Sequence, residues 1–226
     1  MTTKKHIIIY SHGFGVRKDD NGLLSNIAEY LTDMESVLFD YYDLNEVSHE
    51  LLICPTSQQV NKLNKIFNDI KQANPGSIID LIAHSQGTIV AAMARPNGIR
   101  KAILLAPVFD MGLERTLSRY RTKPDAKINI NGTSIIPSLN GLTRIIPKEY
   151  WQERLNIRPF REYNAFAQTT EMIIIEAKQD ELLPKVDMQE LNSKIKIISL
   201  DGDHGFSASA RGALLALIKD LLQEKI

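Results

Sequence analysis

The sequence is poor in the residues that build disulfides and metal sites. It contains one cysteine, Cys54, among 226 residues, so no internal disulfide can form, and no spacing of cysteine and histidine predicts a metal site. Cys54 follows three apolar residues, and we interpret it as a small buried side chain rather than a reactive thiol. We therefore expect neither a metal nor another cofactor.

The chain also lacks net charge and long apolar runs. Its 27 basic side chains balance 27 acidic ones, so no overall attraction to nucleic acid or to an anionic membrane is expected. The apolar run at residues 7–10 is too short for a signal peptide or a membrane span. We therefore predict a cytoplasmic protein without a membrane span and without a nucleic-acid partner.

Apolar, β-branched runs alternate along the chain with segments whose apolar residues have helical spacing. A chain of this length that is 43% hydrophobic can bury one sizeable core, so we expect a single domain over residues 1–226. Strands that are apolar throughout and alternate with amphipathic helices predict an α/β fold with a mostly parallel sheet covered by helices on both faces. About six strands are expected, near residues 7, 37, 79, 103, 173 and 197. The first helix is expected to follow Asn21, which would cap its amino end, and the second to run from residue 57 to before residue 75. A third helix follows the third strand and ends near residue 95. Two more are expected, a short one at residues 185–191 and a final one at the carboxyl end.

The alternation is interrupted between the fourth and fifth predicted strands. Residues 109–168 mix prolines, glycines and aromatic side chains without a clear period, and we interpret them as an insertion. Residues 112–168 contain ten basic against five acidic side chains. This excess would favour an acidic or phosphate-bearing substrate, or an anionic interface, if it faced the site. Solvated surface charge is the simpler interpretation.

The third predicted strand turns abruptly into a helix around a serine. Residues 77–82 form a β-branched run, Ser85 follows it, and residues 88–94 have the composition of a buried helix. This pattern predicts a nucleophile elbow, a strained turn that lifts the serine hydroxyl clear of the sheet. Gly87 is one of the small residues that the turn needs, while Ala83 stands where a glycine is usual.

Other loops at the carboxyl ends of the predicted strands supply partners for Ser85. Functional groups collect at this edge of a doubly wound sheet. A serine hydroxyl needs a histidine to take its proton, and the histidine needs an acid to fix its tautomer. His204 and Asp180 fill these roles, in the chain order serine, acid, histidine that this elbow predicts. Asp110, which follows the fourth strand, and Asp203, which is adjacent to His204, are alternative acids.

Taken together, these pieces resemble the α/β-hydrolases over essentially the whole chain. The resemblance implies an oxyanion hole formed by the backbone N–H groups of Phe14 and Gln86, with residues 109–168 as a cap. It also implies that the chain lacks the family's first two edge strands. We expect His12 to anchor the glycine loop and His84 to pack behind the elbow. The matching pieces are His12-Gly13-Phe14-Gly15, Ala83-His84-Ser85-Gln86-Gly87, residues 180–184 and Gly202-Asp203-His204-Gly205.

The predicted activity is that of a serine hydrolase that cleaves a carboxylic ester or thioester through an acyl-enzyme. A peptidase, an amidase or a carbon–carbon hydrolase would use the same three residues, and a binding protein or receptor would retain them without turnover. A flavodoxin-like or Rossmann nucleotide binder is disfavoured because the glycine loop lacks the full glycine fingerprint. We expect a small-molecule ester or acyl substrate, whose identity the sequence leaves open together with the oligomeric state.

Overall fold

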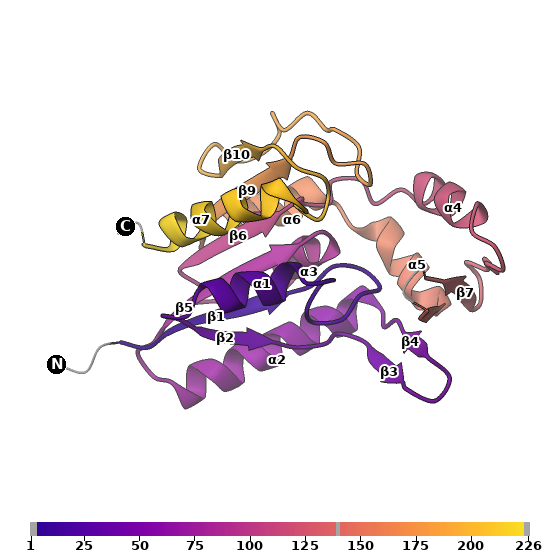
Figure 1. Cartoon of the computed structure of the whole chain (residues 1–226), viewed down its shortest axis with the longest axis horizontal. Coiled ribbons are helices and arrows are strands. Elements are labelled where there is room, and N and C mark those ends of the chain that lie inside the picture. The colour runs from indigo at the N-terminus through magenta and orange to yellow at the C-terminus, as the bar shows by residue number, and fades with distance from the viewer. Residues whose placement is uncertain (1–3, 139–140, 224–226) are drawn as a thin grey trace.

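The centre of the molecule is a six-stranded sheet, seen in a computed structural model that describes residues 4–138 and 141–223. Its strands are β1 (His6–Ser11), β2 (Glu35–Leu38), β5 (Ile78–His84), β6 (Lys101–Leu105), β9 (Glu171–Ala177) and β10 (Lys196–Leu200). They lie in the order β10-β9-β6-β5-β1-β2 (Figure 1), and every neighbouring pair runs parallel. These are the six strands that the apolar runs predict. Within the described residues β2 forms one edge, so no strand lies beyond it on that side.

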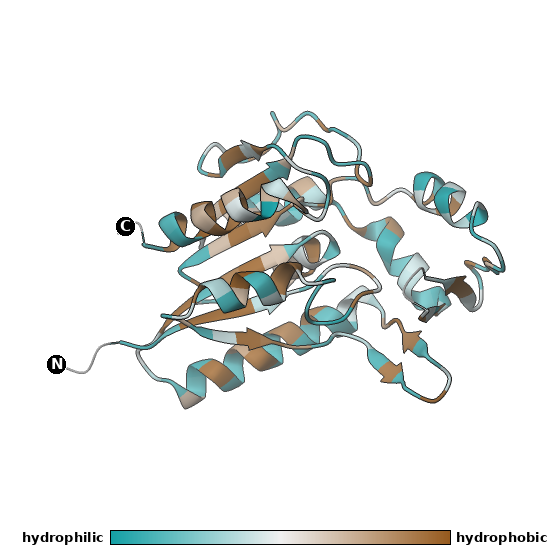
Figure 2. Ribbon diagram, in the orientation of Figure 1, coloured by the Kyte–Doolittle hydropathy of each residue, from teal (hydrophilic) through white to brown (hydrophobic). Residues whose placement is uncertain are grey.

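Helices bury both faces of this sheet. They are α1 (Leu23–Tyr30), α2 (Thr56–Ala73), α3 (Gln86–Ala94) and α7 (Ser209–Gln223). Successive strand residues point to opposite faces, so Ile9 and Leu81 pack under α2 and α3, while Ile8 and Ile82 pack under α1 and α7. Figure 2 shows that the central strands are largely apolar, whereas apolar and polar residues alternate along the helices. Among the described helices none is both long and apolar enough to cross a membrane.

Two of the predicted helix features are wrong. Asn21 does not cap α1, because Gly22 occupies the N-cap in a left-handed conformation (φ 88°) without a side-chain capping bond. Residues 185–191 are irregular, with a turn at residues 189–190, and form no helix. There the Asp187 carboxylate accepts the Gln189 N–H at 3.0 Å, and such local side-chain bonds compete with helix formation. A residue outside this segment also holds it, because the Asn164 side chain donates a hydrogen bond to the Glu190 carbonyl.

Residues 109–168 are more regular than the sequence predicts, and Leu139 and Asn140 within them lie outside the described residues. The segment contains α4 (Leu113–Arg121), β7 (Ser134–Pro137), β8 (Thr143–Ile146), α5 (Lys148–Asn156) and α6 (Pro159–Phe166). In Figure 1, α4, α5 and β7 lie beyond the carboxyl ends of the central strands. The insertion therefore lies at the edge of the sheet where the candidate site residues are expected.

A second sheet joins the insertion to the rest of the chain. It also contains β3 (Asp43–Asn45) and β4 (Glu50–Leu52), and its order is β3-β4-β8-β7. Strand β4 pairs with β8 in parallel, while the β3–β4 and β7–β8 pairs are antiparallel. Strands β3 and β4 are absent from the sequence prediction because three-residue strands are too short to establish a period of two.

The turn from β5 to α3 has the geometry predicted for a nucleophile elbow. Ser85 has φ 50° and ψ −123°, a strained combination for a residue with a side chain. Its N–H donates to the Leu105 carbonyl on β6 at 2.9 Å. A Cβ atom on Gly87 would lie 2.2 Å from the Ser11 carbonyl oxygen, so only glycine fits there. Ala83, in contrast, is an ordinary buried strand residue of β5, and its methyl group is accommodated.

The close approach at Gly87 yields a stability prediction. Gly87→Ala should lower the free energy of unfolding by about 1–3 kcal/mol or more, because the new methyl group must displace backbone rather than a flexible side chain. Gly212→Ala is the matched control, since a methyl group there, in the exposed part of α7, would meet no atom within 4 Å. That control should raise stability by roughly 0.5–1 kcal/mol. Urea denaturation of both variants tests the pair, and equal effects would contradict the elbow geometry.

Candidate active site

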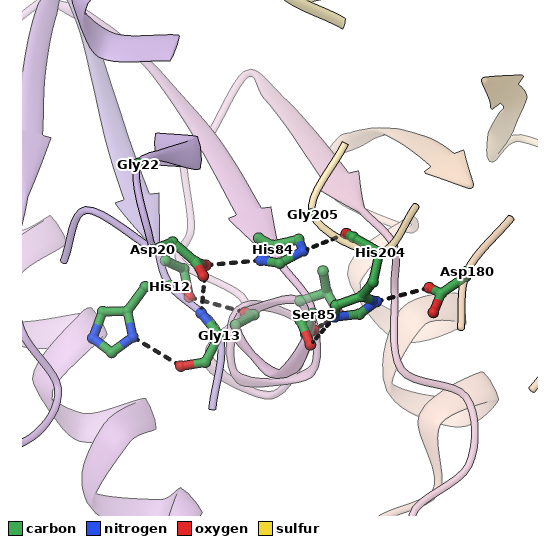
Figure 3. Close-up of polar contacts among 12 residues, drawn as sticks. His12, Gly13, Asp20, Gly22, His84, Ser85, Asp180, His204 and Gly205 are labelled. Atoms are coloured by element: carbon green, nitrogen blue, oxygen red, sulfur yellow. Dashed lines mark hydrogen bonds and ion pairs between the residues drawn. The ribbon is translucent and has the colours of Figure 1, made fainter. Parts of the chain in front are cut away.

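Three of the predicted site residues lie in one hydrogen-bonded row at the carboxyl edge of the sheet. Ser85 follows β5, Asp180 follows β9, and His204 follows β10. Ser85 Oγ lies 2.9 Å from His204 Nε2, and His204 Nδ1 lies 2.8 Å from Asp180 Oδ2 (Figure 3). The structure therefore brings together side chains that are separated by up to 119 positions in the chain.

The environment of Asp180 fixes the tautomer of His204. Partial burial would raise the pKa of Asp180, but the hydrogen bond and charge of His204 and two backbone N–H donors lower it below its usual value. Those donors are Leu182 and Leu183, each 2.8 Å from Asp180 Oδ1. Because an ionised carboxylate only accepts hydrogen bonds, His204 Nδ1 carries a proton. Nε2 of His204 is then free to accept the proton of the Ser85 hydroxyl.

The two alternative acids are occupied elsewhere. The Asp110 carboxylate accepts the N–H of Gly112 at 2.7 Å, within its own exposed loop. Asp203 accepts the N–H of Ser207, also at 2.7 Å, and its other oxygen pairs with the Ser207 hydroxyl. The geometry at His204 thus favours Asp180 over both of them.

The glycine loop after β1 is held by a buried histidine. His12 Nε2 accepts the Tyr41 N–H at 2.9 Å, so Nδ1 carries the proton and donates to the Gly13 carbonyl, also at 2.9 Å. Burial lowers the pKa of His12, which fits this neutral form. His12 therefore anchors the loop, as the sequence predicts.

This loop places Phe14 beside the elbow. Phe14, Ser85 and Gln86 line one pocket of about 70 Å³. Within residues 4–138 and 141–223, neither the Phe14 nor the Gln86 backbone N–H donates a hydrogen bond to a protein acceptor. Two unused donors beside a serine hydroxyl can stabilise an oxygen that gains negative charge.

A second buried row of hydrogen bonds lies behind Ser85. His84 Nδ1 lies 2.8 Å from Asp20 Oδ2, and His84 Nε2 lies 3.0 Å from the His204 carbonyl oxygen (Figure 3). The same Asp20 oxygen accepts the Gly13 N–H at 2.8 Å. One carboxylate and one imidazole thus join the glycine loop, the elbow and the loop that carries His204.

Both partners of this second row are charged. A carbonyl oxygen and a carboxylate both require an N–H donor, so His84 must be protonated at both nitrogens. Burial alone would lower the pKa of His84, but the charge and hydrogen bond of Asp20 raise it above its ordinary value of 6.5. Burial would likewise raise the pKa of Asp20, yet His84 and the Gly13 N–H lower it below 3.8. The site therefore rests on a buried ion pair.

The insertion also touches the elbow directly. The Tyr150 hydroxyl on α5 donates to Gln86 Oε1 at 2.6 Å, and Gln86 Nε2 donates to Gln59 Oε1 on α2 at 3.2 Å. Burial raises the pKa of Tyr150, so its hydroxyl remains a donor. The side chain of Gln86 is thereby fixed between the insertion and the core.

Sequence reasoning missed Asp20, Gln59 and Tyr150. For His84 the sequence predicts only packing behind the elbow. Asp20 and His84 lie 64 positions apart, and nothing in the spacing of one sequence signals such a pair.

Two other kinds of reactive group could act at such a site, a metal-binding cluster and a reactive thiol. In the described part of the chain, no group of three or more His, Cys, Asp or Glu side chains is arranged to hold a metal ion. Cys54 is half-buried and donates weakly to the Tyr41 carbonyl at 3.5 Å. Burial raises the pKa of this thiol to about 11, which keeps it protonated and unreactive at neutral pH.

Comparison with known proteins gives a result at the level of fold. No protein-family model matches the sequence, and no curated protein matches it significantly. Solved structures with 14–18% sequence identity do match. Est1E from Butyrivibrio proteoclasticus, in complex with ferulic acid, has a TM-score of 0.71 at 16% identity and covers 97% of this chain and 88% of its own.

Two further structures give the same picture. A methylesterase from Arabidopsis has a TM-score of 0.62 at 18% identity, covering 96% of this chain and 98% of its own. The thioesterase domain from the curacin biosynthetic pathway has a TM-score of 0.60 at 15% identity, covering 96% and 91%. Together with the parallel sheet and its helices, these likenesses establish that the chain has the α/β-hydrolase fold.

Proposed function

We propose that this protein is a serine hydrolase that cleaves a carboxylic ester or thioester through an acyl-enzyme. The observation that carries the proposal is the unbroken row of hydrogen bonds from Ser85 through His204 to Asp180. Structures of the same fold include a methylesterase and a thioesterase domain, which supports this class of bond. Small-molecule esters or acyl compounds are the proposed substrates.

In the proposed reaction Ser85 is the nucleophile and His204 the proton carrier. Ser85 Oγ attacks the acyl carbon while its proton passes to His204 Nε2. The imidazolium is stabilised by the Asp180 carboxylate, and it then gives the proton to the departing alcohol or thiol. Water attacks the acyl-enzyme in a second step, in which His204 takes a proton from water and returns it to Ser85. The released product is a carboxylic acid.

The oxyanion formed in both steps is assigned to the backbone N–H groups of Phe14 and Gln86. Donors of this kind contribute about 2.7–4 kcal/mol each to transition-state stabilisation in related chemistry. The supporting observation is that Phe14 and Gln86 line the Ser85 pocket and that their backbone N–H groups donate to no protein acceptor in the described part of the chain.

We also propose a single domain in which residues 109–168 act as a cap over Ser85. The cap contacts the elbow through Tyr150, and its side chains line the pocket that contains Ser85. We assign the Asp20–His84 pair a positioning role. It holds the backbone of His204 from the side opposite Asp180, and it holds Gly13 next to the proposed oxyanion donor Phe14.

The nucleophile is tested by Ser85→Ala. We expect ester hydrolysis to fall by several orders of magnitude, on the order of 10⁶-fold in kcat by comparison with other serine hydrolases. The measurement is turnover of a panel of short and long 4-nitrophenyl esters together with labelling by a fluorophosphonate probe. Labelling should disappear in the variant while its thermal unfolding is retained.

Ser25→Ala provides the matched control for this test. Ser25 lies on α1, outside the proposed machinery, so the control should keep both labelling and turnover. Undiminished labelling of Ser85→Ala would disprove the assignment of the nucleophile. Labelling of the natural chain without turnover of any ester would favour a binding role or a different bond class.

The buried ion pair is tested by Asp20→Asn. Removal of one partner from a buried pair costs about 3–5 kcal/mol of stability, because the other charge is left uncompensated. The pKa of His84 is raised, so the contribution of the pair is complete below about pH 6.5 and is lost as the pH rises through the pKa of folded His84. At low pH the contribution of the pair is lost again. The loss begins below the ordinary aspartate pKa of 3.8 and is complete once the pH has fallen through the lowered pKa of Asp20 in the folded protein.

Chemical denaturation at several pH values checks this prediction. The stability difference between the natural chain and Asp20→Asn should be largest between about pH 4 and pH 6.5 and should shrink above that range. Asp19→Asn is the control, because Asp19 is the neighbouring carboxylate and its side chain is exposed. A pH-independent difference would mean that His84 is not charged in the folded protein.

A further inference from the structure

The pocket that contains Ser85 is lined by three arginines. Arg115 and Arg119 come from α4, and Arg154 comes from α5. The one acidic side chain in the lining is Asp110, which is exposed and already accepts the Gly112 N–H. The excess of basic residues that the sequence shows over residues 112–168 is therefore partly gathered at the candidate site, rather than being spread only over the surface.

Arg154 is the most unusual member of this group. Its side chain is buried, with 8% of the residue exposed, and its Nε atom has no hydrogen-bond partner among the described residues. Its Nη2 atom makes two long contacts of 3.4 Å, to the Asp110 carbonyl and to Thr116 Oγ1. No carboxylate in residues 4–138 and 141–223 forms an ion pair with it. A buried guanidinium without an anion is costly, so folding alone does not explain its place.

The other two arginines add to the positive charge on the same side of the pocket. Arg115 and Arg119 are separated by four positions, so they lie on one face of α4, and both are exposed. Burial, followed by the charges of Arg144 and Arg119, lowers the pKa of the nearby Lys123, which reports a positive field in this region. Lys123, Arg119 and Arg144 line one part of the larger cavity that contains Ser85 and His204, whose lining also includes Arg211 and the acidic residues Asp20, Glu181 and Asp203.

We propose that the substrate carries an anionic group, a carboxylate or a phosphate, close to the acyl carbon that Ser85 attacks, and that Arg154, Arg115 and Arg119 bind this group. The inference rests on the proposed hydrolase function and names the substrate class for the same site. The planar guanidinium matches carboxylate and phosphate oxygens in a two-point contact. The small pocket of about 70 Å³ fits a short spacer between the anion and the ester.

The test compares two substrates that differ only in the anion. Mono-4-nitrophenyl adipate carries a carboxylate where 4-nitrophenyl hexanoate carries a methyl group, and spontaneous hydrolysis is subtracted from both rates. We expect kcat/KM to favour the adipate ester by about 10-fold or more, since hydrogen bonds to charged groups contribute at this level. Equal kcat/KM values for the two esters at low salt would overturn the proposal.

Substitutions then show which residues cause the preference for the adipate ester. Arg115→Gln combined with Arg119→Gln should lower the ratio of the two kcat/KM values about 10-fold. Arg121→Gln is the matched control on α4, because Arg121 is exposed, pairs with Glu114 and does not line the pocket. It should leave the ratio unchanged. A ratio that responds equally to both changes would indicate general surface charge and would refute the assigned site.

Arg154→Met separates binding from structure. Replacement of a buried unpaired charge by an apolar side chain should keep or raise the melting temperature, whereas the preference for the adipate ester should be lost. A lower melting temperature with an unchanged preference would show that Arg154 acts only in packing.

A binding measurement keeps this proposal distinguishable from the proposed function. Calorimetric titration of Ser85→Ala protein with adipate and with inorganic phosphate, at equal ionic strength, measures anion binding without turnover and tells which of the two anions the site takes. We expect binding of one of them, weakened about 10-fold or more by Arg115→Gln with Arg119→Gln. Adipate binding without hydrolysis of any ester would contradict only the hydrolase function. Ester hydrolysis without binding of either anion would contradict only the anion site.

Discussion

The buried ion pair of Asp20 and His84 is the interaction on which the rest of the site depends. Two charges out of water are costly unless their remaining hydrogen-bonding groups are satisfied. Here the pair uses both nitrogens of His84 and connects to the Gly13 N–H and the His204 carbonyl oxygen. Three loops from distant parts of the chain are thus joined to each other at backbone atoms. The positions of residues on these loops, such as Ser85 and Phe14, are fixed as a result.

The parallel sheet explains why these loops meet at all. Strands β1, β5, β9 and β10 all run in one direction, and their carboxyl ends lie on one edge. Short loops leave that edge with little freedom, so a serine, a histidine and a carboxylate on different loops come within hydrogen-bond distance. Ser85 has the strained combination of φ 50° and ψ −123°, and Gly87 allows α3 to approach the β1 backbone closely.

Much of this arrangement could be predicted from the sequence, for identifiable reasons. The inner strands β1, β5, β6 and β9 are buried apolar runs, and the edge strands β2 and β10 are short but rich in apolar residues, so all six are predictable. The row of Ser85, Asp180 and His204 follows from which loops end at the same sheet edge. The prediction of a helix at residues 185–191 is wrong because the side chains of Asp187 and Asn164 bond to the backbone and hold it in an irregular conformation. Pairing of Asp20 with His84, and of β4 with β8, depends on tertiary contacts that leave no periodic signal.

The second sheet has a consequence for how this enzyme-like scaffold could be re-engineered. One half of it, β3 and β4, belongs to the chain between β2 and α2, while β7 and β8 belong to the insertion, and the β4–β8 ladder joins them by backbone hydrogen bonds. Residues 109–168 are thus not a self-contained module. An insertion transplanted from another protein of this fold would leave the edge of β4 unpaired unless residues 43–52 were exchanged together with it. Replacing residues 109–168 therefore requires the exchange of two segments rather than one.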